Sequence, residues 1–217
     1  MTISVTLTQV CLVRHGETDW NAERRLQGHL DVPLNATGHL QAAAAASHLA
    51  DKQFAAIYCS DLARARQTAT SIGATSSLTP ISDPALRERH YGQFQGLTYD
   101  EACAQHPVAY ARFLERDPSF AFSDGGESLT TFAHRVRSAL ERIATQHPAQ
   151  RILVVTHGGV LDIAYRLAAG TDLESPRDFT IPNAALNWLE FNGTRWRLLA
   201  WADQTHLANS RDELPNA

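Results

Sequence analysis

The stretch QVCLVRHGETDWN, residues 9–21, decides the fold and raises the first question about function. Residues 9–14 are a short apolar run of the kind that makes a strand buried on both faces. The run ends in Arg14 and is followed by His15, which places a permanent cation beside an imidazole able to act as a nucleophile. A strand end that needed only a turn would not require these residue types, so we expect a functional site here.

Residues 151–170, RILVVTHGGVLDIAYRLAAG, repeat this pattern. A buried strand again ends in a histidine, His157, which is followed by Gly158 at the start of a helix. Ligands of open α/β sheets bind at the carboxyl ends of the strands, so we expect His15 and His157 to face one crevice. Glycine lets backbone N–H groups approach a ligand closely and a helix start suits an anion, so a phosphoryl group is the expected ligand.

Strands and helices alternate through the first part of the chain. An alanine-rich stretch within residues 34–54 predicts a helix with Thr37 as its N-cap. Residues 55–60 then predict a strand, and Ser60 caps a second predicted helix over residues 61–73. This order predicts a three-layer α/β/α fold with a mostly parallel central sheet and right-handed crossovers.

The middle of the chain predicts a helical insertion at about residues 93–127. A short strand is expected before it, around Leu78. Thr98 and Glu101 form a Thr-x-x-Glu capping box, and Pro107 divides the segment that follows into two helical pieces.

The last part of the chain predicts a crossover helix and a β-hairpin. The helix presents one apolar face and is stopped by Pro148. The residues of that face are Leu129, Phe132, Val136, Leu140 and Ile143. Asn192-Gly193 lies between two alternating runs, which predicts a hairpin with a two-residue turn.

Composition limits the function classes. The 217 residues carry 19 Lys and Arg against 23 Asp and Glu, a formal net charge of −4. This balance argues against a broad surface for nucleic acid or for an anionic membrane. The sequence shows no export signal, no membrane-length apolar run and only 3 widely spaced cysteines, so we expect a reduced, cytoplasmic protein. Residues 1–217 are expected to form a single domain that carries the insertion.

Four motifs occur in order along the chain: LVRHGETDWN, SDLARARQTA, LRERHYGQFQGL and VVTHGGV. In this order they resemble the histidine phosphatase superfamily, whose fold is that of the phosphoglycerate mutases. An R-H-G triplet alone would be weak support, whereas four motifs in sequence are specific. The resemblance runs from about residue 9 to residue 192.

The resemblance implies a role for each motif. His15 would attack phosphorus and become phosphohistidine, while Arg14, Arg64 and His157 would hold the phosphoryl oxygens. Neighbouring guanidinium charge lowers the pKa of a histidine, which keeps its lone pair free near neutral pH. Glu88 would give a proton to the leaving oxygen and then activate water, because a nearby phosphate dianion raises a carboxyl pKa.

Further substrate contacts follow from the same motifs. By analogy with the family's phosphate-side loop, neutral hydrogen bonds would come from Asn21 and from Gln27 and Gly28. Beyond the phosphoryl group, Arg89 and Tyr91 are expected at the rest of the substrate, and Gly158 near the ligand. The histidines lack the spacing with a carboxylate that a zinc site on a helix would show, so we expect no metal and no other cofactor.

The fate of the phosphoryl group separates a phosphatase from a mutase, and the sequence points both ways. The stretch ERHYGQFQGL resembles the mutase form, but Tyr99 stands where the mutases usually carry a lysine, and RLQGHLDVPLN resembles the phosphatase branch. The arginine- and proline-rich insertion of those mutases is missing, and the residues after Asp203 have little basic character to grip a bisphosphate.

We therefore expect a cofactor-independent phosphomonoesterase that acts on a small phosphorylated metabolite through a phosphohistidine intermediate. Phosphoglycerate mutase is the alternative. A protein that keeps the pocket as a scaffold without turnover is a third, non-enzymatic reading, which release of nitrophenol from p-nitrophenyl phosphate would exclude. The identity of the ester and the oligomeric state are not encoded in these motifs.

Overall fold

The computed structural model describes residues 7–207. The expectations for the first residues of the chain and for most of the segment after Asp203 concern residues 1–6 and 208–217, which lie outside the described residues. Among residues 7–207, no helix is both long and apolar enough to cross a membrane.

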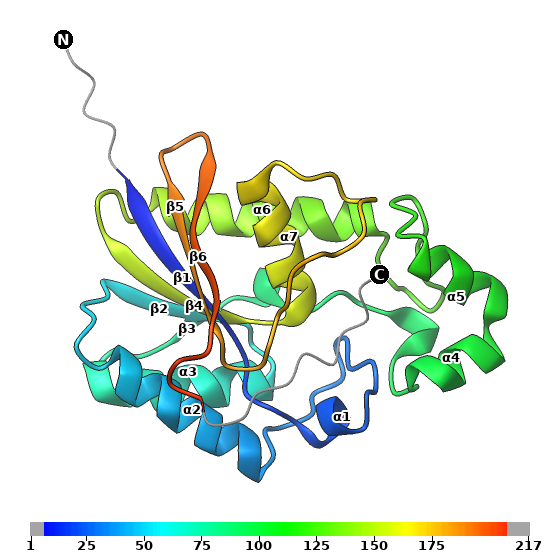
Figure 1. The fold of residues 1–217 in the computed structure, drawn as a ribbon, viewed down its shortest axis with the longest axis horizontal. Helices are drawn as coiled ribbons and strands as arrows, with labels where there is room; N and C mark the ends of the chain where they lie inside the picture. Colours follow the sequence, from blue (N-terminus) through cyan, green and yellow to red (C-terminus); the bar gives the residue numbers. More distant parts are fainter. Residues whose placement is uncertain (1–6, 208–217) are drawn as a thin grey trace.

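A six-stranded sheet forms the centre of the molecule, with the strand order β3-β2-β4-β1-β5-β6 (Figure 1). The strands are β1 (Thr8–Arg14), β2 (Ala56–Cys59), β3 (Ile81–Ser82), β4 (Arg151–Thr156), β5 (Leu186–Phe191) and β6 (Trp196–Asp203). The first four run parallel, whereas β5 pairs antiparallel with both β1 and β6. The predicted mostly parallel sheet is confirmed.

Strands β1 and β4 are direct neighbours, and their register decides where the functional residues lie. Arg14, at the end of β1, pairs with Thr156, at the end of β4. The two strand ends are therefore level at one edge of the sheet. Residues His15 and His157, although far apart in the chain, follow these ends directly.

Helices cover both faces of the sheet (Figure 1). One face is covered by α2 (Ala36–Leu49) and α3 (Ala63–Ser76), and the other by α6 (Leu129–Thr145) and α7 (Gly158–Ala169). This arrangement confirms the predicted three-layer α/β/α fold. The alternation of side chains along a strand produces it, because successive residues point to opposite faces.

Strand β1 shows this alternation clearly. Val10 and Leu12 belong to the apolar core beneath α6 and α7, whereas Cys11 and Val13 belong to the core beneath α2 and α3. All four are at most 1% exposed. A strand buried on both faces must be apolar throughout, which explains the continuous apolar run from which the fold was predicted.

Two short helices follow the third sequence motif and lie at one end of the molecule (Figure 1). They are α4 (Tyr99–Gln105) and α5 (Pro107–Leu114), and Thr98 caps α4 with the predicted capping box. The break at Pro107 is therefore confirmed. This end has an apolar cluster of its own, formed by Leu26, Tyr91, Phe94, Tyr99, Ala102, Phe120 and Phe122.

Three local predictions were wrong. Asn35, not Thr37, is the N-cap of α2, and its side-chain oxygen accepts from the N–H of Gly38. Helix α3 is preceded by Leu62 as its N-cap, while the Ser60 hydroxyl accepts from the N–H of Leu62 one turn earlier. The short strand expected around Leu78 forms instead at β3, because α3 extends to Ser76.

The hairpin between β5 and β6 forms where it was predicted, but its loop is longer. The N–H of Asn192 donates to the carbonyl of Arg195, and the Asn192 side chain accepts from the N–H groups of Thr194 and Arg195. The loop thus spans four residues rather than two, because the asparagine side chain organises a wider turn.

Candidate active site

His15 lies directly after β1 and is 3% exposed. Its Nδ1 lies 2.7 Å from the carbonyl oxygen of Gly16. A carbonyl oxygen only accepts, so Nδ1 carries the proton and the lone pair of the neutral ring is on Nε2. The backbone thereby selects the tautomer in which Nε2 can act as a nucleophile.

His157 faces His15 from the end of β4, with the two ring centroids 5.1 Å apart and the rings edge to face. Nε of Arg64 donates to Nδ1 of His157 at 3.3 Å. Because Nδ1 accepts, the proton of this second ring is on Nε2. That Nε2 atom is buried and has no hydrogen-bond partner among the residues that the structure describes.

Backbone carbonyl groups fix the orientation of the Arg64 side chain. Its Nη1 donates to the carbonyl of Leu30 and its Nη2 to the carbonyl of Gly28, each at 2.8 Å. The side chain is 1% exposed, and burial lowers its pKa to about 10, so the guanidinium keeps its charge at neutral pH. Arg66, two positions further on, is exposed.

Arg14 brings a second buried guanidinium to the same place. It is 2% exposed, and its Nη1 donates to the carbonyl of Ile181 at 2.7 Å. Arg14 and Arg64 line one pocket together with His15 and Glu88. Two buried positive charges beside an imidazole provide a local site for an anion in a protein whose overall charge is negative.

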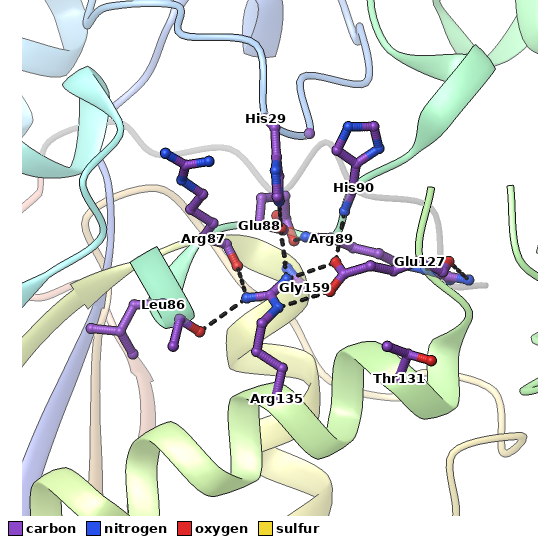
Figure 2. A network of polar contacts seen from close by, with 12 residues as sticks. His29, Leu86, Arg87, Glu88, Arg89, His90, Glu127, Thr131, Arg135 and Gly159 are labelled. Atoms are coloured by element: carbon purple, nitrogen blue, oxygen red, sulfur yellow. Dashed lines mark hydrogen bonds and ion pairs between the residues drawn. The ribbon is translucent and has the colours of Figure 1, made fainter. Parts of the chain in front are cut away.

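Glu88 lies in a segment without helix or strand, opposite the start of α7. Its Oε1 accepts from the N–H of Arg89 at 2.8 Å, and its Oε2 accepts from the N–H of Gly159 at 3.0 Å (Figure 2). A Cβ atom on Gly159 would lie 2.3 Å from Glu88 Oε1. Glycine at this position is therefore needed for the carboxyl group to approach the helix.

The pKa values of these groups shift in the directions that general acid and nucleophilic chemistry needs. Burial, together with the charges of Arg64 and Arg14, lowers the pKa of His15 well below its ordinary value of 6.5. Burial raises the pKa of Glu88 above its ordinary value of 4.5, although the two N–H donors and both arginines oppose this.

We expect these shifts to appear in the pH dependence of kcat/KM for an alkyl phosphate. If His15 is the nucleophile and Glu88 the acid, the reactive form has neutral His15 and protonated Glu88. The rate then falls at low pH as His15 gains a proton and at high pH as Glu88 loses one. The acid limb should lie below pH 6.5, because the pKa of His15 is lowered from that value. Initial rates measured across the pH range for the wild-type enzyme and for Glu88→Gln define both limbs of the pH profile. An acid limb above pH 6.5, or an alkaline limb that persists unchanged in Glu88→Gln, would contradict this assignment.

Close backbone packing holds the first motif in place. A Cβ atom on Gly16 would lie 2.4 Å from the carbonyl oxygen of Gly38, so Gly16 is required by its contact with α2. The N–H of Gly16 donates to the hydroxyl of Thr68 on α3 at 3.1 Å. The expectation that this N–H approaches a ligand was therefore wrong, because the protein itself occupies the donor.

Asn183 is a supporting residue that the motifs did not reveal. Its side-chain nitrogen donates to the carbonyl of His15 at 2.9 Å, and the neighbouring Ala184 N–H donates to the carbonyl of Arg14 at 3.0 Å. The segment before β5 thus fixes the backbone of the first motif. A buried asparagine in a largely apolar stretch was the available signal, since a buried polar side chain needs a partner.

The expected substrate-binding residues divide between two places. Asn21 and Gln27 line the pocket of His15, and the Gln27 Oε1 atom is buried without a partner among the described residues. Gly28 is not a lining residue of that pocket and acts through its carbonyl, which holds Arg64. Asn21 also belongs to the short helix α1 (Asp19–Ala22), whose N-cap Thr18 it joins in a capping box.

A second pocket adjoins the first, and Tyr91 and Tyr99 line both. The expected residues Arg89 and Gly158 line this second pocket, as do Arg116 and Arg177. Arg89 is also anchored to the protein, since its guanidinium donates to the carbonyls of Glu127 and Phe120. The pocket of His15 is thus continuous with a second, neighbouring space through the two shared tyrosines.

The remaining histidines lie outside this constellation. The ring of His90 contacts the ring of His29, with centroids 4.7 Å apart, rather than the pocket of His15. Among residues 7–207, no group of three or more His, Cys, Asp or Glu side chains is arranged to hold a metal ion.

Comparisons with known proteins agree with this geometry. Residues 10–204 match the family described as "Histidine phosphatase superfamily (branch 1)". "Phosphoglycerate mutase-like protein 4" of Arabidopsis thaliana is 42% identical over 94% of this chain and 88% of its own length. "Metal-independent phosphoserine phosphatase" of the same plant is 38% identical over 94% of this chain and 84% of its own length.

Among solved structures, "Bacillus stearothermophilus YhfR" superposes with a TM-score of 0.85 at 32% identity, covering 92% of this chain and 98% of the other. The family match spans nearly the whole described chain and contains every residue of the two pockets. The chain therefore belongs to the histidine phosphatase superfamily, and it is an enzyme of the phosphatase and phosphoryl-transfer class.

Proposed function

We propose that this enzyme hydrolyses phosphate monoesters of small metabolites through a phosphohistidine formed on His15. The main support for this proposal is that the imidazole rings of His15 and His157 adopt complementary tautomers. His15 offers a lone pair on Nε2, while His157 offers an Nε2 proton that has no partner among the described residues. A buried donor left unpaired costs about 1–3 kcal/mol, and a phosphoryl oxygen would satisfy it.

In the first step, Nε2 of His15 attacks phosphorus and the bond from phosphorus to the ester oxygen breaks. The carboxyl group of Glu88 gives its proton to the departing oxygen, so the alcohol leaves neutral. Arg14, Arg64 and His157 bind the three non-bridging oxygens, whose charge they neutralise throughout the transfer.

In the second step, the Glu88 carboxylate takes a proton from water, and the water oxygen attacks phosphorus. The bond from phosphorus to Nε2 of His15 breaks, inorganic phosphate leaves, and Glu88 is again protonated. Each group thus returns to its starting state. No residue outside this set is needed to balance protons or electrons.

The second pocket is proposed to hold the alcohol part of the substrate. Arg89, Arg116 and Arg177 line it, and so does Asp162, with which Arg116 forms an ion pair at 2.7 Å. The lining carries three guanidinium groups against one carboxylate, and guanidinium groups bind carboxylates well, which favours phosphate esters that also carry a carboxylate. Phosphoserine, which the name of one relative contains, is therefore a first substrate to examine.

Phosphoglycerate mutase activity is the second candidate, favoured by the 42% identity to a protein named phosphoglycerate mutase-like. The two activities differ only in what accepts the phosphoryl group from His15. Inorganic phosphate release should be measured over a panel containing phosphoserine, 3-phosphoglycerate and sugar phosphates, beside conversion of 3-phosphoglycerate to 2-phosphoglycerate. Conversion faster than phosphate release would replace the phosphatase proposal with the mutase, and no turnover of any ester would leave the scaffold alternative.

We also propose that the enzyme is cytoplasmic. Cys11, Cys59 and Cys103 are free thiols, which suits a reducing compartment such as the cytoplasm. We further propose that residues 1–217 act as a single domain.

A further inference from the structure

The segment that carries Glu88 has little regular structure. We call residues 85–90 the acid loop. Beyond a short 3-10 turn (Pro84–Leu86) it contains no helix or strand, so regular backbone hydrogen bonds do not fix Glu88. General acid catalysis nevertheless requires the carboxyl group within hydrogen-bond reach of the leaving oxygen. The N–H groups of Arg89 and Gly159 hold the carboxyl group itself, so the position of the loop backbone depends on contacts from other parts of the chain.

Arg135 of α6 supplies three of these contacts (Figure 2). Its Nη1 donates to the carbonyls of Ala85 and Arg87, each at 2.9 Å, and its Nη2 donates to the carbonyl of Glu88 at 3.1 Å. One planar guanidinium thus binds three carbonyl oxygens of the acid loop. From the other side, Nε2 of His29 donates to the same Glu88 carbonyl at 2.8 Å.

Glu127 holds Arg135 in this orientation. Its two carboxylate oxygens accept from Nε and Nη2 of Arg135 at 2.8 and 2.7 Å, a bidentate pair. Oε2 of Glu127 also accepts from the N–H of His90 at 2.9 Å. Although burial alone would raise the pKa of Glu127, Arg135 and the His90 N–H hold it below its ordinary value, so the carboxylate stays charged.

The two ends of the loop are therefore tied to one ion pair. Arg135 binds the carbonyls of residues 85, 87 and 88, and Glu127 binds the N–H of His90. The Arg135 and Glu127 side chains are 22% and 16% exposed, so water screens the pair only in part. A bidentate, partly buried pair has a defined geometry, unlike a solvated surface pair.

We propose that Arg135 and Glu127 form a clamp that positions the Glu88 carboxyl group for proton transfer, and that they are positioning residues of the acid step. The inference rests on the proposed function, because it assumes that Glu88 is the proton donor. Neither clamp residue lines the pocket of His15. Their effect must therefore pass through the acid loop and not through contact with the phosphoryl group.

A displacement of the acid affects substrates unequally, which makes the proposal testable. An alkyl phosphate needs a proton on its leaving oxygen, whereas p-nitrophenolate is stable as an anion and leaves without one. A misplacement of about 1 Å can cost about 10²-fold in rate. We expect Arg135→Met to lower kcat/KM for phosphoserine or another accepted alkyl phosphate by about that factor, and to change kcat/KM for p-nitrophenyl phosphate by less than about fivefold. All comparisons use kcat/KM, which excludes the later hydrolysis of phosphohistidine.

The matched control lies on the same helix. Arg137 pairs with Glu141 at 2.9 Å on the exposed face of α6, and its side chain is 57% exposed. Arg137→Met should leave both substrates unchanged. Glu127→Gln removes the charge of the other clamp residue with little change in shape, so it should show the same selectivity as Arg135→Met and tests the clamp even where Arg135→Met does not fold.

Combining Arg135→Met with Glu88→Gln in one variant shows whether the clamp acts through Glu88. If the clamp acts through Glu88, Arg135→Met adds little to the loss on the alkyl phosphate once Glu88 is already replaced. Equal slowing of both substrates by Arg135→Met and Glu127→Gln, or losses that multiply with that of Glu88→Gln, overturns the clamp. If Glu88→Gln alone slows both substrates equally, the acid role of Glu88 and that part of the proposed function fail instead.

Discussion

Replacing His15 by alanine is expected to abolish turnover. The substitution removes the atom proposed to accept the phosphoryl group, and loss of a covalent nucleophile lowers kcat by at least about 10⁴-fold. Release of nitrophenol from p-nitrophenyl phosphate measures the loss. When a reaction of the wild-type enzyme is quenched during turnover, mass spectrometry should find one phosphoryl group on the peptide that contains His15.

The control for this substitution is His39→Ala, because His39 is an exposed histidine at the start of α2. It should keep full activity. A His15→Ala variant that folds normally and keeps more than about one-tenth of the activity would show that another group accepts the phosphoryl group or that water attacks directly.

Glu88→Gln is expected to produce the second largest loss, and only with poor leaving groups. Glutamine preserves the shape and can still accept one of the two N–H bonds from Arg89 and Gly159, but it cannot give up a proton. A general acid contributes about 10²–10⁴-fold, so kcat/KM for the alkyl phosphate should fall by that factor, while kcat/KM for p-nitrophenyl phosphate falls less than about tenfold. The comparison uses kcat/KM because it excludes the hydrolysis of phosphohistidine, in which Glu88 is the proposed base for both substrates.

Values of kcat/KM for a series of aryl and alkyl phosphates give this result as a steeper dependence on the leaving-group pKa. Glu115→Gln is the matched control, since Glu115 is an exposed glutamate in the same part of the chain. The acid role is lost to another residue if Glu88→Gln slows all members of the series by one common factor.

The central sheet could be predicted because its signal is local. The apolar runs that became β1 and β4 are buried on both faces, and such strands need no long-range information to be recognised. The position of the second histidine motif beside the first follows from the rule that ligands bind at the carboxyl ends of parallel strands. Direct pairing of β1 with β4 provides the physical reason.

Capping residues and supporting contacts could not be predicted in the same way. Asn35 and Thr37 are both good N-caps, and only the contact of the Asn35 side chain with the Gly38 N–H decides between them. Arg135 is one of several arginines on the polar face of α6 in the sequence. Its role depends on carbonyl groups of the acid loop, which is about 50 residues away in the chain.

The central place of β1 has a consequence for the durability of the enzyme. This strand pairs with β4 on one side and with β5 on the other, so its backbone N–H groups can exchange with solvent only when the sheet itself opens. His15, the proposed nucleophile, directly follows its last residue, Arg14. Partial loosening at α4 and α5 would therefore alter the second pocket, which Tyr99 and Phe113 line, long before it displaced His15.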